Sequence, residues 1–126
     1  NRRAGQWIYS KGQDTYAPFG PCIVTADEIG DPHALDLWLT VNGETKQKSN
    51  TRHMLFKVPA LIADISAAIA LEPGDIICMG TSARGVGDYP NGHRDINLHA
   101  RDGTMEVEIE GLGRLANPID RAWLRR

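Results

Sequence analysis

The chain has 126 residues, of which 41% are hydrophobic and 24% charged, and its 14 basic and 16 acidic side chains give a formal net charge of −2. This length suits one domain with a single core, and the interspersed charges argue against nucleic-acid binding. No apolar segment approaches the roughly 20 residues that a membrane span needs, and the start has no signal or transit pattern, so we expect a soluble, cytoplasmic protein.

The first expected element is a short β-prone strand over residues 6–9, which leads into a loop over residues 10–21 that we call the lysine loop. This loop combines Lys11, Asp14 and Thr15 with two glycines and two prolines, and it has no apolar period that would build a core. Glycine widens the accessible backbone angles and proline fixes them, so the loop should present side chains rather than bury them. The alternative is a plain surface connection between two strands.

A short strand is expected over residues 22–24, followed by one helical turn with Thr25 as its N-cap. His33 follows in a loop, where we expect a solvated side chain rather than a metal ligand. Cys22 and Cys78 are far apart and form no Cys-x-x-Cys pair, which favours free, buried thiols in a reducing compartment.

Residues 35–41 alternate apolar and polar side chains, which is typical of a half-buried strand. The pair Asn42 and Gly43 then predicts a hairpin, because both central positions of a type I′ turn need positive φ. Residues 44–48 form the returning strand, which we expect to be solvent-exposed, with its lysines protecting a sheet edge.

In the polar loop that follows, His53 has no second ligand at metal spacing and is interpreted as structural. Apolar residues then recur every three or four positions over residues 59–71, which predicts a helix with Pro59 in its first turn. A Pro-Gly pair ends this segment and leads to a buried strand over residues 75–79.

A second glycine-rich loop covers residues 80–87 and contains Gly80, Thr81 and Arg84. Its glycines would allow the backbone to approach a carboxylate or phosphate closely, with N–H groups and the arginine as donors. The spacing matches neither the P-loop nor the dinucleotide fingerprint, which disfavours nucleotide binding. Residues 88–95 show no period and form a neighbouring loop that could act as a lid.

Near the end, residues 105–109 alternate apolar residues with Glu106 and Glu108, and a final strand is expected near residues 114–116. The regular alternation indicates a solvated acidic face rather than a metal site. The basic tail from Asp120 should lie at the surface or on a partner. Short strands separated by turns, with one clear helix, predict an α+β, mostly β fold.

These blocks resemble the C-terminal part of the catalytic domain of the fumarylacetoacetate hydrolase family. The similarity runs in order from about Arg3 to about Ile119, without large gaps. The residues that carry it are Lys11-Gly12, Asp14-Thr15-Tyr16-Ala17-Pro18, Gly20-Pro21, Val24-Thr25, Ile29, Asp31-Pro32, Leu37-Trp38-Leu39, Val41-Asn42-Gly43-Glu44, Asn50-Thr51, Met54, Phe56, Leu71-Glu72-Pro73-Gly74-Asp75, Gly80-Thr81, Gly85-Val86-Gly87, Glu108-Ile109-Glu110-Gly111-Leu112-Gly113 and Asn117-Pro118.

The resemblance implies that residues 1–126 are the C-terminal part of one catalytic domain with a distorted β-roll or β-sandwich fold. It makes Lys11 a catalytic ammonium that lies, with Thr15, beside a divalent metal, which is Mg²⁺ or alternatively Mn²⁺ or Ca²⁺. Gly80 and Thr81 would bind substrate, while Ser82 stands where many relatives have proline.

The resemblance also bears on the start of the chain, where Asn1 opens a polar, glycine-ended run that is typical of a connection inside a longer protein. In the family, the metal-binding carboxylates, a catalytic His/Glu pair and a substrate-contacting glutamine precede the lysine loop. The carboxylate ligands are therefore expected upstream of Asn1. We expect a fragment rather than a protein that has lost its catalytic half.

The leading hypothesis is a metal-dependent hydrolase that cleaves a C–C bond in a small 1,3-diketo or 2-oxo acid, such as an acylpyruvate or fumarylacetoacetate. One alternative is a hydratase, isomerase or decarboxylase of the same family, and another is a noncatalytic binding or structural module. The resemblance also implies a homodimer. Trp38 gives weak independent support, because tryptophan is enriched at interfaces, although it could instead lie under the helix of residues 59–71.

Overall fold

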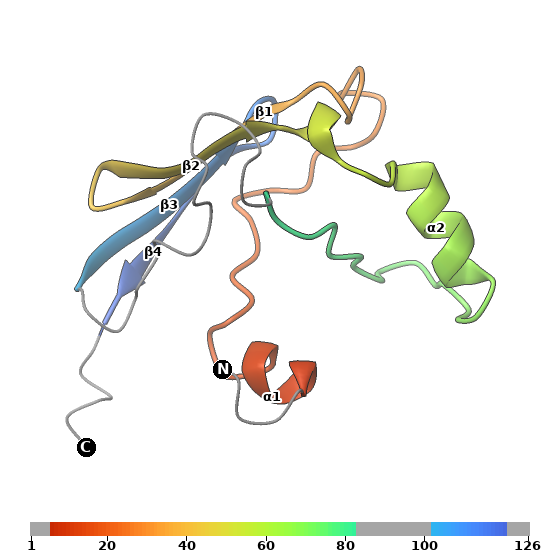
Figure 1. The fold of residues 1–126 in the computed structure, drawn as a ribbon, viewed down its shortest axis with the longest axis horizontal. Coiled ribbons are helices and arrows are strands. Elements are labelled where there is room, and N and C mark those ends of the chain that lie inside the picture. The colour runs from red at the N-terminus through yellow and green to blue at the C-terminus, as the bar shows by residue number, and fades with distance from the viewer. Residues whose placement is uncertain (1–5, 83–101, 121–126) are drawn as a thin grey trace.

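The computed structural model describes residues 6–82 and 102–120, and its architecture is mostly β with few helices, as expected (Figure 1). The elements in chain order are α1 (Trp7–Lys11), β1 (Asp36–Val41), β2 (Glu44–Asn50), the 3₁₀ turn η1 (Thr51–His53), α2 (Val58–Ser66), β3 (Gly103–Ile109) and β4 (Gly113–Ile119). The run that begins at Asn1, the glycine-rich loop from residue 83 onward, the expected loop over residues 88–95 and the basic tail beyond residue 120 lie outside the described residues.

The four strands form one open antiparallel sheet in the order β2-β1-β3-β4. Two hairpins, β1–β2 and β3–β4, are joined through the pairing of β1 with β3. In the middle of the sheet, Leu39 stands opposite Gln47 on one side and Val107 on the other. The strands predicted from alternation over residues 35–41, 44–48 and 105–109, and the final strand near residue 114, are thereby confirmed.

The two faces of the sheet differ in chemistry, because successive side chains of a strand point to opposite sides. We call one the apolar face; it carries Leu37, Leu39 and Val41 of β1, Met105, Val107 and Ile109 of β3, and Leu115 of β4. We call the other the polar face; it carries Trp38, Thr40, Glu106, Glu108 and Arg114. The alternation predicted for residues 35–41 and 105–109 therefore sets the two faces.

The β1–β2 turn has the predicted geometry, since Asn42 has φ 53° and Gly43 has φ 78°. The Asn42 side chain also reaches the start of β3: its Oδ1 accepts a hydrogen bond from the N–H of Thr104 at 2.9 Å, and its Nδ2 donates to the carbonyl of Asp102 at 3.1 Å. A Cβ at Gly103 would overlap the Asn42 side chain, so this position needs glycine. The turn therefore fixes β3 as well as β2.

The returning strand β2 lies at the sheet edge, as predicted, but it is not solvent-exposed throughout. The register shifts between Leu39 and Thr40, which leaves Lys46 as the extra residue of a β-bulge. The Lys46 side chain is only 10% exposed and pairs with Glu44. Beyond the bulge, Gln47 falls on the apolar face and is buried. The expectation of an exposed strand was wrong because a bulge shifts the alternation by one residue.

The strand expected over residues 6–9 is instead the helix α1. Its Trp7 and Ile8 side chains are exposed, and the N–H of Gly12 donates to the carbonyl of Ile8 at 2.7 Å. β-prone residues form a strand only where a neighbouring strand offers backbone partners. In the described structure the run lies apart from the sheet, so its backbone bonds locally (Figure 1).

Four other predictions need correction. Residues 22–24 and 75–79 run without strand pairing in the described structure. The helix α2 ends at Ser66 rather than at residue 71, although proline does occupy its first turn as predicted. The hydroxyl of Ser66 donates to the carbonyl of Ala63, a local bond that competes with helix continuation. Both cysteines are free, as expected, but exposed rather than buried.

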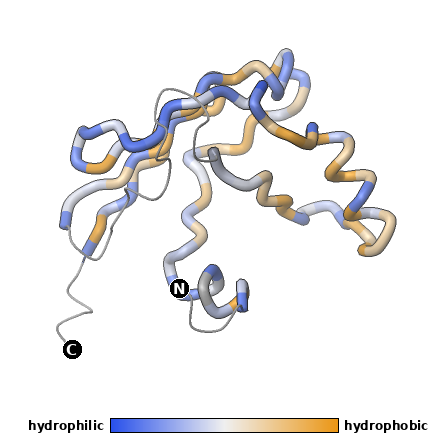
Figure 2. Tube along the Cα trace, in the orientation of Figure 1, coloured by the Kyte–Doolittle hydropathy of each residue, from blue (hydrophilic) through white to orange (hydrophobic). Residues whose placement is uncertain are grey.

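Among the described residues, Val41 is the one fully buried apolar side chain, at 2% exposure. Apolar stretches lie instead along α2 and the segment that follows it (Figure 2). The large apolar side chains that remain exposed are Trp7, Ile8, Tyr9, Tyr16, Phe19, Ile23, Leu55, Phe56, Ile62, Ile69, Ile76 and Met79. In Figure 1, α2 extends away from the sheet rather than covering β1, the strand that carries Trp38.

Candidate functional site

The end of the lysine loop crosses the apolar face of the sheet over β3 and β4. The thiol of Cys22 lies 3.8 Å from the carbonyl oxygen of Leu112, to which it donates. Between this loop and the strands is a cavity of about 410 Å³, lined mainly by apolar side chains. Its lining comprises Pro18, Phe19, Gly20, Cys22, Ile23, Val24, Met105, Val107, Ile109, Leu112, Gly113, Leu115 and Asn117.

The start of the glycine-rich loop reaches the same face at its other side, over β2. The Nε2 of Gln47 donates a hydrogen bond to the Oγ1 of Thr81 at 3.3 Å. Gly80 has φ 91°, and nothing described lies within 4 Å of the place where a Cβ would stand. The backbone there is therefore open to a close approach, as the sequence predicted for a ligand loop.

Lys11 and Thr15 lie at the C-terminal end of α1 and in the turn after it, and both are exposed. The ammonium of Lys11 lies 6.0 Å from the centre of the Trp7 ring, at the limit of a cation–π contact. Thr15 has φ 67°, a left-handed conformation that strains a β-branched residue by roughly 1–3 kcal/mol. Such strain is typical of functional loops, so it accords with a special role for this turn.

The structure does not bring the two predicted groups together. In Figure 1, α1 lies well below the sheet, whereas the described segment that follows α2 finishes beside the sheet. Lys11 and Thr15 therefore lie at one place in the structure, and Gly80 and Thr81 lie at a second place, beside the sheet. The part of the loop that continues from Thr81, including Arg84, lies outside the described residues.

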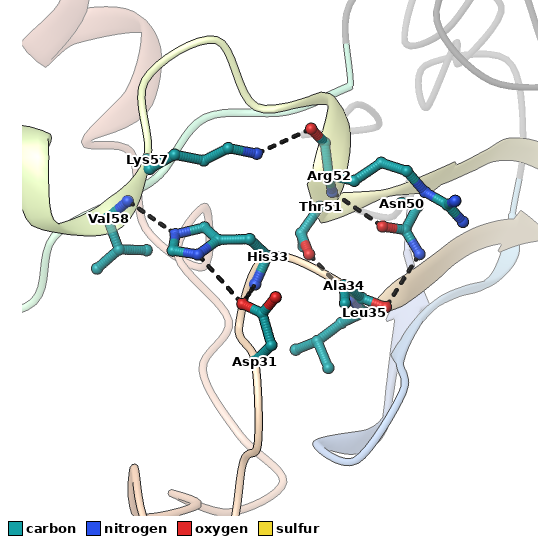
Figure 3. Close-up of polar contacts among 9 residues, drawn as sticks. All are labelled: Asp31, His33, Ala34, Leu35, Asn50, Thr51, Arg52, Lys57 and Val58. Atoms are coloured by element: carbon teal, nitrogen blue, oxygen red, sulfur yellow. Dashed lines mark hydrogen bonds and ion pairs between the residues drawn. The ribbon is translucent and has the colours of Figure 1, made fainter.

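A polar cluster holds the connection between the sheet and α2 (Figure 3). Asn50, only 6% exposed, donates to the carbonyl of Ala34 at 3.1 Å and to the carboxylate of Asp36 at 2.6 Å, and accepts from the N–H of Arg52 at 2.9 Å. The hydroxyl of Thr51 accepts from the N–H of Leu35 at 3.0 Å. These bonds satisfy polar groups that would otherwise be left unpaired where the chain leaves β2.

His33 belongs to this cluster and is not the solvated residue that the sequence predicted, since its side chain is only 20% exposed. Its Nε2 accepts a hydrogen bond from the N–H of Val58 at 3.0 Å, while its Nδ1 lies 3.2 Å from the Asp31 carboxylate. The imidazole therefore joins the loop before β1 to the first residue of α2. Nearby, the ammonium of Lys57 donates to the carbonyl of Arg52 at 2.8 Å.

The polar face of the sheet holds a second hollow, of about 260 Å³, lined by Trp38, Thr40, Gly43, Glu106, Glu108 and Arg114. The carboxylate of Glu106 accepts from the hydroxyl of Thr40 at 3.1 Å and forms an ion pair with Arg114. The hydrogen bond from the guanidinium holds the pKa of Glu106 below its ordinary value and raises the pKa of Arg114. Glu106 is thus bound into the sheet rather than simply solvated.

A metal ion needs several oxygen, nitrogen or sulfur ligands in one place. Within residues 6–82 and 102–120, no three His, Cys, Asp or Glu side chains gather closely enough to hold one. Lys11 is a cation and Thr15 offers one neutral oxygen, so these two residues do not make a metal site by themselves. The carboxylate ligands were expected upstream of Asn1, and Asn1 itself lies outside the described residues. The position of Lys11 and Thr15 beside a metal therefore stays a prediction.

Two buried amides, Gln47 and Asn50, were assigned no role by the sequence reasoning. Gln47 was assigned to an exposed strand, and only the bulge at Lys46 turns it inward. Asn50 appeared within a family-like pair, but its burial depends on the neighbouring carbonyl of Ala34, sixteen residues away. Testing alternative registers of the β1–β2 hairpin, including one with a bulge, could have indicated that Gln47 faces inward.

The open antiparallel sheet, with irregular loops over its apolar face, makes this a mostly β architecture. The chain belongs to the fumarylacetoacetate (FAA) hydrolase C-terminal family, whose sequence model matches residues 1–120. The resemblance noted from the sequence is thereby confirmed, and the mostly β fold is the one expected for that family.

Three known proteins are similar to this chain. A Burkholderia multivorans protein is 47% identical over 112 residues, covering 88% of this chain and 38% of the relative. A maleylpyruvate hydrolase of Sphingobium sp. SYK-6, solved with manganese(II) and pyruvate, is 40% identical, with a TM-score of 0.68 and coverage of 83% and 36%. A 5-carboxymethyl-2-hydroxymuconate delta-isomerase of Mycobacterium smegmatis is 39% identical, with a TM-score of 0.74 and coverage of 93% and 41%.

The chain thus spans about two fifths of the length of the relatives it matches. These relatives include hydrolases and isomerases of small organic acids, and one binds a divalent metal with pyruvate. None of the helices in the described residues is long and apolar enough to cross a membrane.

Proposed function

We propose that the protein is a divalent-metal-dependent enzyme that hydrolyses a C–C bond in a small 1,3-diketo or 2-oxo acid, of the acylpyruvate or fumarylacetoacetate type. Family membership supports the class of enzyme. The observation that carries the substrate class is the position of Thr81, whose hydroxyl is held at the sheet by Gln47 in a chain 40% identical to a pyruvate-binding hydrolase.

Such a reaction adds water across the bond between a carbonyl carbon and the carbon next to it. The water oxygen joins the carbonyl carbon, which leaves as a carboxylic acid, while the electron pair stays on the pyruvate side as an enolate that then takes up a proton. A positive charge near the enolate oxygen lowers the barrier. We assign this role to the Lys11 ammonium, with Thr15 beside it, which requires α1 to lie closer to Thr81 in the whole protein than it does in this structure.

Gly80 and Thr81 are proposed to bind the substrate's carboxylate. The open backbone at Gly80 and a hydroxyl donor at Thr81 suit a carboxylate, which accepts several hydrogen bonds. Mg²⁺ or Mn²⁺, or alternatively Ca²⁺, is the proposed cofactor, and a bound cation of this kind would stabilise the enolate. We further propose that residues 1–126 act as the C-terminal part of one catalytic domain, with the carboxylate ligands of the metal upstream of Asn1.

The test uses the protein as its gene encodes it, assayed with an acylpyruvate in Mn²⁺ or Mg²⁺ and again after chelation. Lys11→Met should lower kcat by at least about 100-fold, because a charge that acts mainly in the transition state is lost. Lys57→Met, which removes a positive charge from the polar cluster instead, should keep its turnover. Unchanged kcat in Lys11→Met would refute the role of Lys11, and turnover that survives chelation would refute the cofactor.

Isomerisation is the second candidate, because a relative of similar identity is a delta-isomerase. Hydration or decarboxylation of a 2-oxo acid is a further alternative within the same family. Product analysis separates these reactions, since hydrolysis yields two acids, decarboxylation releases carbon dioxide and isomerisation leaves the mass unchanged. A noncatalytic module would turn over none of the substrates with or without metal.

We also propose that the protein forms a homodimer through the polar face of the sheet. Trp38 stands on this face beside Glu108 and Arg114, where it lines an open hollow. A half-buried tryptophan flanked by charged groups is typical of an interface anchor. In a two-fold interface the same residues from each copy would meet.

A further inference from the structure

Gln47 is a polar side chain in an apolar row. Across the sheet, its neighbours at the same level are Leu39, Val107 and Leu115, in that order. The glutamine is 5% exposed, and its strand is the edge of the sheet. Placing an amide here is unfavourable unless it is hydrogen-bonded, so its hydrogen bond to Thr81 offsets a real penalty.

The direction of that hydrogen bond determines what the threonine can do. A hydroxyl group has one hydrogen to donate and two lone pairs that accept. Since Gln47 donates to Oγ1 of Thr81, one lone pair is occupied and the hydroxyl hydrogen remains available for another acceptor. Accepting a hydrogen bond also polarises the hydroxyl and makes it a better donor.

We propose that Gln47 is a positioning residue, which orients the Thr81 hydroxyl so that it donates its hydrogen to a carboxylate oxygen of the bound acid. This inference rests on the proposed function, in which Thr81 binds substrate. Gln47 itself does not touch the substrate. Its side chain is anchored in β2, whose backbone is paired in the sheet, and it holds the hydroxyl of Thr81 at the start of the glycine-rich loop.

A purely structural glutamine would tie the loop to the sheet and do nothing else. The two roles differ in kinetics. A carboxylate contact is made equally in the ground state and the transition state, so losing its orientation raises KM and leaves kcat unchanged. Loosening the whole loop would lower thermal stability and kcat together.

The variant that tests this is Gln47→Met, which keeps the shape and apolar fit but removes the donor. In the protein as its gene encodes it, KM for the acylpyruvate and Kd for pyruvate should rise by about 3- to 10-fold, the usual net worth of one hydrogen bond between neutral groups. The value of kcat should change by less than about twofold. Ser49→Ala is the matched control, since Ser49 is also buried on the same side of β2.

A double-mutant cycle locates the effect at Thr81. Thr81→Val should raise KM at least as much as Gln47→Met, and adding Gln47→Met to Thr81→Val should then have no further effect. Thr81→Ser keeps the hydroxyl and should keep the sensitivity to Gln47. Gln47→Glu, of nearly the same volume, is a second variant should Gln47→Met not fold; its carboxylate can accept but not donate, so KM should rise further.

Equal behaviour of Gln47→Met and Ser49→Ala would overturn the inference, as would additive effects in the cycle. If Thr81→Val leaves pyruvate binding and KM unchanged in an active enzyme, the substrate role of Thr81 fails and the positioning role fails with it. If Thr81→Val weakens binding but neither Gln47 variant does, only the positioning role fails and the proposed function stands.

Discussion

The two faces of the sheet use polar side chains in different ways. On the polar face, Glu106 is bonded to Thr40 of β1 and Arg114 of β4, so its partners belong to the sheet itself. On the apolar face, Gln47 bonds outward to Thr81, in a loop thirty-four residues away. The first arrangement joins strands to one another, whereas the second joins the sheet to a predicted ligand loop.

From this difference we expect only the apolar face to support both the core of the sheet and the binding of substrate. Interactions on the polar face should matter for folding or association and leave substrate binding unchanged. Those on the apolar face should matter for the core and for the loops that rest on it. Each of the following changes tests one side of this division.

The largest effect on stability is expected on the apolar face, at Val41. Because this side chain is fully buried, Val41→Ala should leave a cavity and lower the free energy of unfolding by about 2–3 kcal/mol. Thr45→Ala, on the polar face opposite Thr40, should lower it by less than about 1 kcal/mol. Urea unfolding at neutral pH measures both, and equal losses would contradict the division between the faces.

The next effect concerns association through the polar face. Trp38→Glu places like charges against one another across a two-fold interface and should weaken the proposed dimer by about 10- to 100-fold. Sedimentation of the protein over a range of micromolar concentrations gives the dissociation constant. A wild-type protein that sediments as a monomer would refute the dimer, and a dimer unaffected by Trp38→Glu would exclude only this residue from the interface.

A smaller effect is expected where the sheet joins α2. His33→Ala removes the acceptor of the Val58 N–H and should lower the free energy of unfolding by about 1 kcal/mol. His33→Gln, whose side-chain oxygen can reach the position of Nε2, should recover part of the loss. Amide exchange at Val58 reports the bond directly, and unchanged protection in His33→Ala would contradict it.

The smallest effect is the pH dependence from Glu106. Its pKa in the folded protein lies below the ordinary value, so the folded state binds this proton less readily than the unfolded state does. The stabilisation is therefore complete above about pH 4.5 and is lost as the pH falls through the folded pKa. Glu106→Gln should flatten the fall in stability in this acid range.

The control for this prediction is Glu108→Gln, which leaves the ion pair between Glu106 and Arg114 in place. Its stability should still fall with acid below about pH 4.5. Thermal unfolding followed between pH 3 and pH 6 compares the variants. A slope in Glu106→Gln that equals the wild-type slope would show that this ion pair does not control acid stability.

Local patterns were enough to predict the sheet, because alternation and the Asn42-Gly43 turn are properties of short segments. The pairing of β1 with β3 was not predictable in this way, since sixty residues separate Asn42 from Asp102. The bulge at Lys46 was missed for the same reason: it depends on register, not composition. The helix at residues 7–11 shows that local preference can also mislead. This β-prone segment has no neighbouring strand to pair with, so it forms a helix.

For the candidate site, Lys11, Thr15, Gly80 and Thr81 came from a family resemblance and the character of two loops. The structure adds a contact, from Gln47 to Thr81, that no residue pattern contains. Composition alone predicts that amide side chains such as those of Gln47 and Asn50 lie at the surface. Their burial follows from which strand or carbonyl they face, which is a property of tertiary structure.

The β1–β2 turn also has a consequence for the order in which the sheet forms. A two-residue hairpin closes within microseconds, whereas bringing β3 onto β1 requires closing a loop of about sixty residues, which is slower. The two hydrogen bonds of the Asn42 side chain to the start of β3 can form only after that second step. Asn42, which begins the first hairpin, therefore makes its contacts with β3 late in folding. Its substitution should raise the unfolding rate of the sheet more than it lowers the folding rate.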